Sequence, residues 1–166
     1  PAYDDSLWQS GPGFLGFGEI IPIIDPKIPG LQTNNLRRDR NAGLVTYYFR
    51  TEFEFTGDPI GAQLMIDHLV DDGVRYYLNG QVIGSIRLPD GVIDSNTEGD
   101  KLPLEDIVEE GVLTLDVSSS LLQGTNVFAA EVHNESDGSS DLVFGARVKI
   151  AANPVGNNEI DLDDSL

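Results

Sequence analysis

Two consecutive residues, Asn79 and Gly80, constrain the fold of this chain more than any others. They separate two short segments of alternating apolar side chains, residues 74–78 and 81–83. Asn-Gly between such segments is typical of a type I′ turn, because both central residues of that turn need positive φ angles. The pattern therefore predicts a tight antiparallel β-hairpin.

Residues 46–55 (TYYFRTEFEF) have the two-residue period of a half-buried strand. One face of this strand carries Tyr47, Phe49, Phe53 and Phe55, and the other carries Tyr48, Arg50, Glu52 and Glu54. Similar strands are predicted at residues 63–70, 113–117, 127–133 and 142–150. Residues 127–133 are apolar on both faces, as expected of a central strand. Because helical periodicity is nearly absent, the sequence predicts an all-β fold, an antiparallel β-sandwich.

The length of 166 residues fits one domain with a real core. We expect a β-sandwich, carbohydrate-binding-like domain over residues 1–152 and an acidic linker to a neighbouring domain over residues 153–166. Two long connections, residues 19–43 and 87–111, separate the predicted strands, and one helical turn is expected after Pro103. The chain begins without Met or a signal peptide, so we expect it to be a piece of a larger or processed protein.

Acidic residues dominate the charge: 28 Asp and Glu against 10 Lys and Arg give a net charge of −18. Such a field disfavours nucleic acid and anionic lipid as partners. No apolar stretch approaches the roughly 18 residues of a membrane span. The absence of cysteine excludes disulfides and thiolate metal sites. Solvated surface explains most of the carboxylates, and affinity for divalent cations is the alternative.

Two acidic segments are candidate calcium sites. Asp71 and Asp72 stand on a glycine-relaxed turn at the mouth of the hairpin, and Asp137 and Asp141 belong to the polar loop after residue 133. Calcium prefers such hard oxygen ligands, which predicts a structural Ca2+ that can also bridge to a ligand. In the alternative interpretation, these side chains accept backbone N–H groups and shape ordinary turns.

A sugar site needs aromatic rings for the C–H faces of pyranoses and planar polar groups for their hydroxyls. The candidate rings are Trp8, Tyr48 and Tyr77. The candidate ligand-binding residues are Trp8, Arg75, Tyr77, His133 and Asn134. Alternatively, Trp8 packs under a glycine-rich loop and His133 is a hydrogen-bonded histidine at a strand end. The arginines of residues 37–40 could read a charged polysaccharide or neutralise the chain's own acidic loops.

Several motifs together resemble a known family. They are Leu7-Trp8-Gln9-Ser10-Gly11, Thr46-Tyr47-Tyr48-Phe49-Arg50, Val70-Asp71-Asp72-Gly73, Leu78-Asn79-Gly80, Gly124-Thr125-Asn126-Val127 and Ser139-Ser140-Asp141-Leu142. Over residues 5–151 the chain is similar to the galactose-binding-domain-like accessory domains of large secreted bacterial proteins. The resemblance implies a jelly roll that accompanies glycan-active enzymes, phosphoesterases or adhesins. In flocculin-type lectins, a different sandwich family, adjacent aspartates hold a calcium that also receives sugar hydroxyls.

No motif indicates catalysis: the sequence has no Gly-x-Ser-x-Gly elbow, phosphate-binding glycine loop or His-Glu-x-x-His. We therefore expect a non-catalytic carbohydrate-binding module of a secreted or cell-surface multidomain bacterial protein. We expect the module to be a monomer. By binding a polysaccharide, the module would hold a neighbouring catalytic domain of the same polypeptide near the substrate of that domain. The alternative is a calcium-stabilised structural or adhesion spacer without a sugar site. A small glycan-cleaving enzyme is the third hypothesis, because 28 acids leave paired carboxylates open.

Overall fold

A computed structural model describes residues 5–8, 10–11, 15–17, 34–35, 43–100, 109–151 and 159–161. This part of the chain forms β-strands and contains no helix, so it also offers no helix long and apolar enough to cross a membrane. The strands are β1 (Leu15–Phe17), β2 (Asn34–Asn35), β3 (Thr46–Phe55), β4 (Gln63–Asp71), β5 (Gly73–Leu78), β6 (Gln81–Ile86), β7 (Glu109–Asp116), β8 (Gly124–His133), β9 (Leu142–Ala151) and β10 (Glu159–Asp161).

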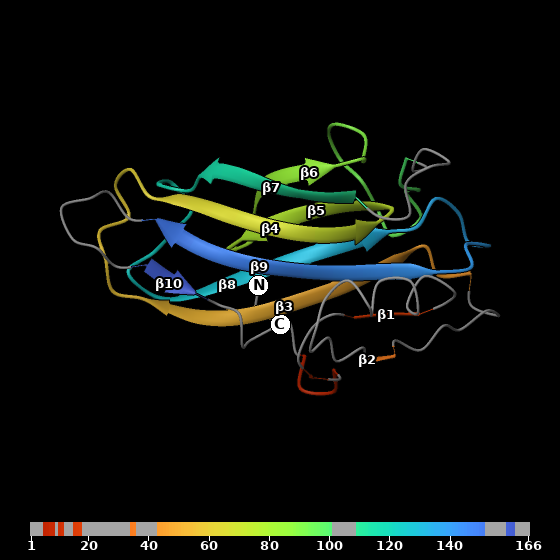
Figure 1. Ribbon diagram of the computed structural model, residues 1–166, viewed down its shortest axis with the longest axis horizontal. Coiled ribbons are helices and arrows are strands. Elements are labelled where there is room, and N and C mark those ends of the chain that lie inside the picture. The colour runs from red at the N-terminus through yellow and green to blue at the C-terminus, as the bar shows by residue number, and fades with distance from the viewer. Residues whose placement is uncertain are drawn as a thin grey trace.

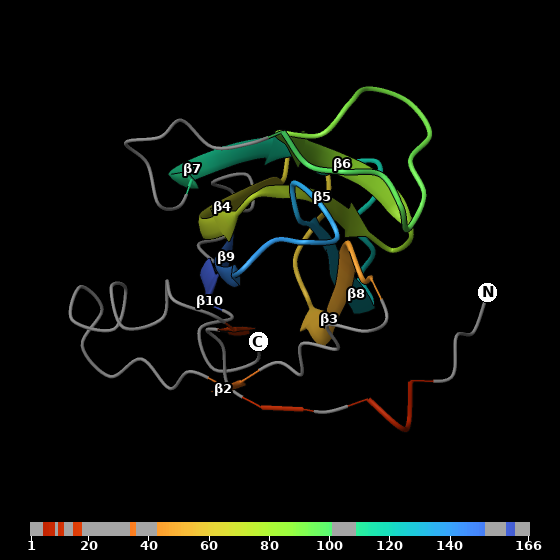
Figure 2. The same ribbon diagram turned by 90° about the vertical axis from the view of Figure 1, so that its right-hand side faces the viewer.

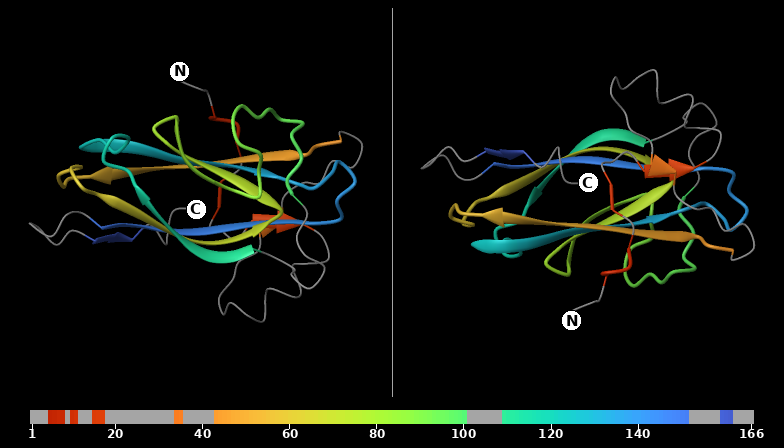
Figure 3. Two further views of the ribbon diagram at one scale, coloured as in Figure 1. Left: turned by 90° about the horizontal axis from the view of Figure 1, so that it is seen from above. Right: turned by 90° about the horizontal axis from the view of Figure 1, so that it is seen from below.

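The strands are arranged in two layers, which Figure 1 shows face-on and Figure 3 shows from above and below. Sheet A has the order β2-β1-β9-β4-β7, with β10 also paired to β9, and sheet B has the order β3-β8-β5-β6. Every pair is antiparallel except β1 with β2. The predicted all-β sandwich is therefore confirmed.

Aromatic side chains from both sheets fill the space between the layers. The rings of Phe49 on β3 and Phe144 on β9 stack at 4.8 Å, and Tyr76 on β5 packs against Phe128 on β8 at 5.8 Å. Each fully buried large apolar side chain contributes about 1.5–3 kcal/mol to stability. The inward face predicted for residues 46–55 is confirmed, because Phe49, Phe53 and Phe55 all belong to this core.

The Asn-Gly hairpin is confirmed between β5 and β6. Asn79 and Gly80 have φ angles of 52° and 79°, the two positive values that a type I′ turn needs. The Asn79 side chain also donates to Asn126 Oδ1 at 2.8 Å and to the Ser120 carbonyl at 2.7 Å. The turn is thereby tied to the start of β8, a contact between distant residues that the local pattern does not reveal.

Two boundaries differ from the sequence prediction. Strand β7 begins at Glu109, so part of the expected 87–111 connection is a strand. Within residues 153–166, expected to be a linker, Glu159–Asp161 form β10 along the edge of β9. An edge strand offers unpaired N–H and C=O groups, and such pairing depends on the partner strand rather than on local periodicity. The helical turn expected after Pro103 lies outside the described residues.

Candidate functional site

Sheet B turns one face away from the core, and the register of its strands brings tyrosines together there. Tyr48 on β3 is paired with Glu131 on β8, and Glu131 with Arg75 on β5. The next outward row joins Arg50, Ala129 and Tyr77 in the same way. We call these residues the outer face of sheet B: Tyr48, Arg50, Arg75, Tyr77, Ala129 and Glu131.

The two tyrosines stand on opposite sides of β8. Because neighbouring strands lie about 4.8 Å apart, β3 and β5 are separated by about 10 Å across β8. Tyr48 is 49% exposed, Tyr77 is partly exposed, and the short side chain of Ala129 lies between their strands. The two tyrosines are therefore diagonal to each other across β8, Tyr48 level with Glu131 and Tyr77 level with Ala129, and both have access to solvent.

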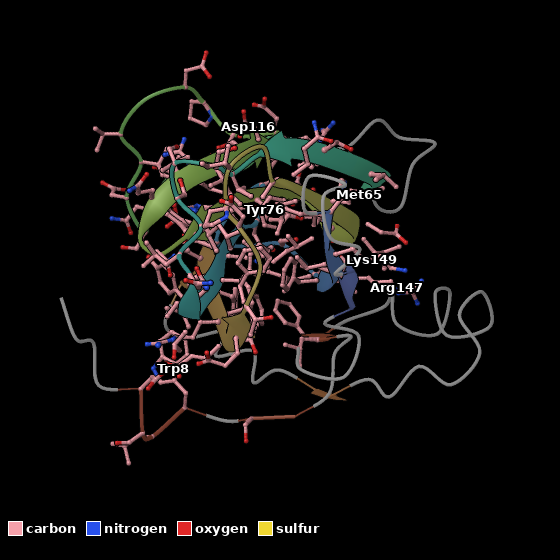
Figure 4. The ribbon with its side chains drawn as sticks, turned by 90° about the vertical axis from the view of Figure 1, so that its left-hand side faces the viewer. Trp8, Met65, Tyr76, Asp116, Arg147 and Lys149 are labelled. Atoms are coloured by element: carbon pink, nitrogen blue, oxygen red, sulfur yellow. The ribbon has the colours of Figure 1, made fainter. Side chains whose placement is uncertain are left out.

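Trp8 lies at the margin of this face. Figure 4 shows it beside β3, away from the outer residues of sheet A such as Met65 and Lys149. Its segment is held by an ion pair between Asp5 and Arg50 of β3 (3.1 Å) and by the turn hydrogen bond from the Trp8 N–H to the Asp5 carbonyl (2.8 Å). The three aromatic candidates of the sequence analysis are thus found on one side of the molecule.

Glu131 is a buried carboxylate in the Tyr48 row, between Tyr48 and Arg75. The Tyr77 hydroxyl donates to Glu131 Oε1, and His133 Nε2 lies 3.8 Å from Oε2. Burial opposes ionisation of Glu131, but the proximity of His133, the hydrogen bond from Tyr77 and the charge of Arg75 outweigh burial and lower its pKa. Burial and the hydrogen bond to Glu131 raise the pKa of Tyr77 to about 12. This tyrosine therefore stays a neutral donor and the glutamate a charged acceptor.

The loop of residues 87–100 covers one end of the face (Figure 2, the green segment that leaves β6). Arg75 holds it, donating to Ser85 Oγ (2.9 Å) and to the carbonyls of Gly91 (2.8 Å) and Pro89 (2.9 Å). His133 Nδ1 donates to the Thr97 carbonyl at 2.6 Å, since a carbonyl can only accept. The loop thus forms a wall next to the Tyr48 row.

The structure brings Arg75, Tyr77 and His133 together around Glu131, which sequence reasoning did not select. Glu131 sits in the apolar run of β8, so only the strand register reveals its position opposite Tyr48. Arg75, His133 and Asn134 are buried, and they support the face and its loop rather than present side chains to solvent. Among the predicted ligand residues, Tyr77 and Trp8 have accessible surface; contact with a ligand stays a prediction for all five.

The aspartate pair lies where the chain passes from sheet A to sheet B. Asp71 ends β4 and Asp72 precedes β5, and the peptide bond between them is cis. The expectation of an open acidic turn is wrong: Asp71 is 6% exposed and Asp72 is 5% exposed. Asp72 Oδ2 accepts the Glu135 N–H at 2.7 Å, and Gly99 packs so closely that a Cβ there would lie 3.4 Å from Asp72 Cβ.

Asp71 is surrounded by negative charge. Burial, the charge of Asp72, a hydrogen bond with Asp72 and the charges of Asp141 and Glu135 raise its pKa to about 8. Asp71 therefore holds a proton at neutral pH when no cation is bound. Of the other predicted calcium ligands, Asp141 contributes through its charge to the raised pKa of Asp71. Asp137 is exposed and lies against Gly43.

The predicted calcium ligands do not form one compact set. Nowhere in the described part of the chain do three or more His, Cys, Asp or Glu side chains gather as a ready-made metal site. Asn134 Oδ1, one residue from the Glu135 N–H that binds Asp72, is buried and has no hydrogen-bond partner among the described residues. The acid corner (Asp71, Asp72, Glu135 and Asp141) thus has the chemistry of a cation site without the assembled geometry.

No protein-family model and no curated protein matches this sequence. Among solved structures, the chain is similar to an α-L-rhamnosidase from Dictyoglumus thermophilum, with 19% identity over 70% of this chain and 12% of that one and a TM-score of 0.45. It is also similar to the Streptomyces avermitilis α-L-rhamnosidase complexed with L-rhamnose (20% identity, 72% of this chain, 10% of that one, TM-score 0.45). A third is the β-glucuronidase from Ruminococcus gnavus in complex with D-glucuronic acid (12% identity, 74% of this chain, 29% of that one, TM-score 0.36).

The chain spans between a tenth and about a third of the length of these three glycosidases, because the matched shares are 12%, 10% and 29%. At these identities and TM-scores, the likeness carries no argument about activity. The function must therefore be argued from the outer face of sheet B.

Proposed function

We propose that this chain is a non-catalytic carbohydrate-binding module that binds a polysaccharide on the outer face of sheet B. The observation that carries the proposal is the placement of Tyr48 and Tyr77 on the outer face of sheet B, diagonally across β8, with Tyr48 paired to the charged acceptor Glu131 and Tyr77 paired to the small Ala129. Tyrosine rings supply flat apolar surface together with a polar hydroxyl. A pyranose needs both properties, because its faces carry C–H groups and its rim carries hydroxyls.

The supporting residues make this surface rigid before a ligand arrives. Tyr77 is fixed by Glu131, and the neighbouring loop is fixed by two hydrogen bonds from Arg75, which also donates to Ser85 on β6. A binding surface held by packed strands and hydrogen bonds loses little side-chain entropy on binding. This arrangement supports recognition by a preformed face rather than by a mobile loop.

Such a module would serve a secreted or cell-surface multidomain protein, in which it holds a catalytic domain near its polymer substrate. A tethered module raises the effective concentration of the attached domain even when its own affinity is modest. The jelly-roll, galactose-binding-like topology and the monomeric state belong to the same proposal.

Calcium at the acid corner is the second part of the proposal. Asp71, Asp72 and Asp141 would supply hard oxygen ligands, with the buried Asn134 Oδ1 as a neutral acceptor nearby. A divalent cation would relieve the repulsion that raises the pKa of Asp71. The melting temperature should therefore fall when EDTA replaces calcium, and the fall should be smaller for the Asp71→Asn variant. An equal Tm with calcium and with EDTA for the wild-type protein would contradict a structural ion.

Binding is tested by affinity gel electrophoresis against a panel of plant and marine polysaccharides. At least one polymer should retard the protein, and the Tyr48→Ala variant should migrate faster in it than the wild type. Met65→Ala is the matched control, because Met65 is 40% exposed on the outer face of sheet A (Figure 4). Retardation by none of the polymers would favour the structural or adhesion spacer.

A further inference from the structure

The positive charges on the outer face of sheet B are already engaged within the protein. The Arg50 guanidinium pairs with Asp5 at 3.1 Å and with Glu52 at 3.0 Å. Arg75 is buried and donates through all three of its nitrogens to Ser85 and to two loop carbonyls. An acidic sugar would have to displace these partners before it reached either guanidinium.

The charged side chains that remain exposed on this face are acidic; they stand beside the exposed Tyr48 and uncharged residues such as Thr125 and Val82. Glu52 and Glu54 are exposed on β3, in line with Tyr48 and Arg50, and the wall loop adds exposed carboxylates at Asp90 and other positions. Glu131, between Tyr48 and Arg75 in the strand register, is a buried carboxylate whose Oε1 already accepts from Tyr77, so the acceptors at the surface are the exposed carboxylates. The polar groups offered to a ligand are therefore mainly hydrogen-bond acceptors, which suit hydroxyl donors.

The net charge of the whole chain also disfavours binding of acidic polymers. A net charge of −18 gives a repulsive field for polyanions, and this field extends about 8–10 Å from the surface at physiological salt. Charge of one sign slows association with like-charged partners and weakens their binding. Uronate and sulfate groups would meet repulsion here without a compensating fork of donors.

We propose that the outer face of sheet B is selective for polysaccharides that carry no carboxylate or sulfate groups. Their hydroxyls are hydrogen-bond donors to the acidic side chains, and their C–H faces stack on Tyr48 and Tyr77. The inference rests on the proposed carbohydrate-binding function and names the substrate class of that same site. The ring contacts supply affinity, and the carboxylates supply selection against acidic polymers.

The test uses pairs of polymers that share a backbone and differ in acidic groups. Suitable pairs are hydroxyethyl cellulose with carboxymethyl cellulose, dextran with dextran sulfate, and neutral arabinoxylan with glucuronoxylan. In at least one pair the neutral member should bind about tenfold more tightly, a difference of about 1.4 kcal/mol. Amino-bearing polymers are left out, because the −18 charge would attract them whatever the site. Binding of the neutral member should change less than about twofold between low and high NaCl, since no ion pair is formed.

Two variants separate the contributions of ring and charge. Tyr48→Ala should weaken binding of the neutral polymer about tenfold, as the loss of a central aromatic contact does. Glu52→Lys removes one acceptor of this face and reverses its charge, so it should not strengthen binding of the neutral polymer but should strengthen binding of the acidic member about twofold to fivefold at low salt. Met65→Ala, on the opposite sheet, should change neither, and equal melting temperatures would show that all variants fold.

The outcomes distinguish the two proposals. Tighter binding of the acidic member in every pair that binds would overturn the selectivity and leave carbohydrate binding standing. Binding of neither member in any pair would overturn both proposals. Unchanged neutral-polymer binding in Tyr48→Ala would overturn the outer face of sheet B as the binding site, and with it the selectivity argued from that face.

Discussion

Replacing Asp71 with Asn should make the protein more stable above neutral pH. The pKa of Asp71 is raised from 3.8 to about 8, so the folded protein holds a proton there that the unfolded chain releases above about pH 4. Stability from this group is complete below the unfolded pKa and is lost as the pH rises through the folded pKa. Each pKa unit corresponds to about 1.4 kcal/mol, which sets an upper limit of about 6 kcal/mol for the four-unit shift.

The amide of Asn reproduces the neutral, protonated state. Its NH2 group can donate to the Asp72 carboxylate, as the Asp71 proton does, and it adds no charge to the acid corner. At about pH 4 and below, the variant and the wild type should therefore unfold within about 1 kcal/mol of each other. At about pH 8 and above, the variant should be more stable by several kcal/mol, a large part of the 5–15 kcal/mol typical of a domain.

The assay is urea unfolding in EDTA at half-unit pH steps, with the free energy of unfolding extrapolated to zero urea. The informative quantity is the difference between variant and wild type, because the acidic residues outside the acid corner titrate equally in both proteins. Asp90→Asn is the matched control. This substitution also removes one negative charge, but it does so at an exposed side chain instead of a buried one. A variant-minus-wild-type difference that stays flat across this range would refute the reasoning.

Two further predictions concern buried positions. Tyr76→Phe should keep or raise stability, by up to about 2 kcal/mol, because the Tyr76 hydroxyl is buried without a hydrogen-bond partner among the described residues; urea unfolding measures the difference. Gly99→Ala should lower Tm by several degrees, whereas Gly138→Ala should leave it nearly unchanged. A Cβ at Gly99 would lie 2.6 Å from the His133 carbonyl oxygen and 3.0 Å from the Gly73 nitrogen, while one at Gly138 would have only an ordinary contact. Equal Tm values for the two glycine variants would show that the 87–100 loop yields without strain.

The strands of the sandwich were predictable because their signal is local. Residues 46–55 alternate so regularly that the predicted bounds are those of β3, and the Asn79–Gly80 turn follows from the φ angles that these residues tolerate. Strand β7 begins four residues before its predicted start, and β10 was not predicted at all. The start of β7 and the existence of β10 both depend on pairing with another strand. The periodicity within a segment does not show which strand will pair with it.

The candidate site was only partly predictable for the same reason. Alternation along β3 and β5 gave the outward direction of Tyr48 and Tyr77, but their meeting across β8 depends on register between strands far apart in sequence. Composition marked Asp71 and Asp72 as acids on a turn, and such residues are usually solvated. Their burial comes from Gly99 and the Glu135 N–H, which approach from other parts of the chain.

The acid corner and the outer face of sheet B share a single support. Gly99 donates its N–H to the Asn134 carbonyl at 2.9 Å, next to the Glu135 N–H that binds Asp72. The same loop is held on the outer face by Arg75 and by His133 through Thr97. A charge change at Asp71 therefore acts on the segment that forms the wall beside Tyr48. A cation that stabilises the acid corner should therefore strengthen glycan binding. Because the coupling between two binding sites is reciprocal, the glycan should strengthen cation binding by the same factor.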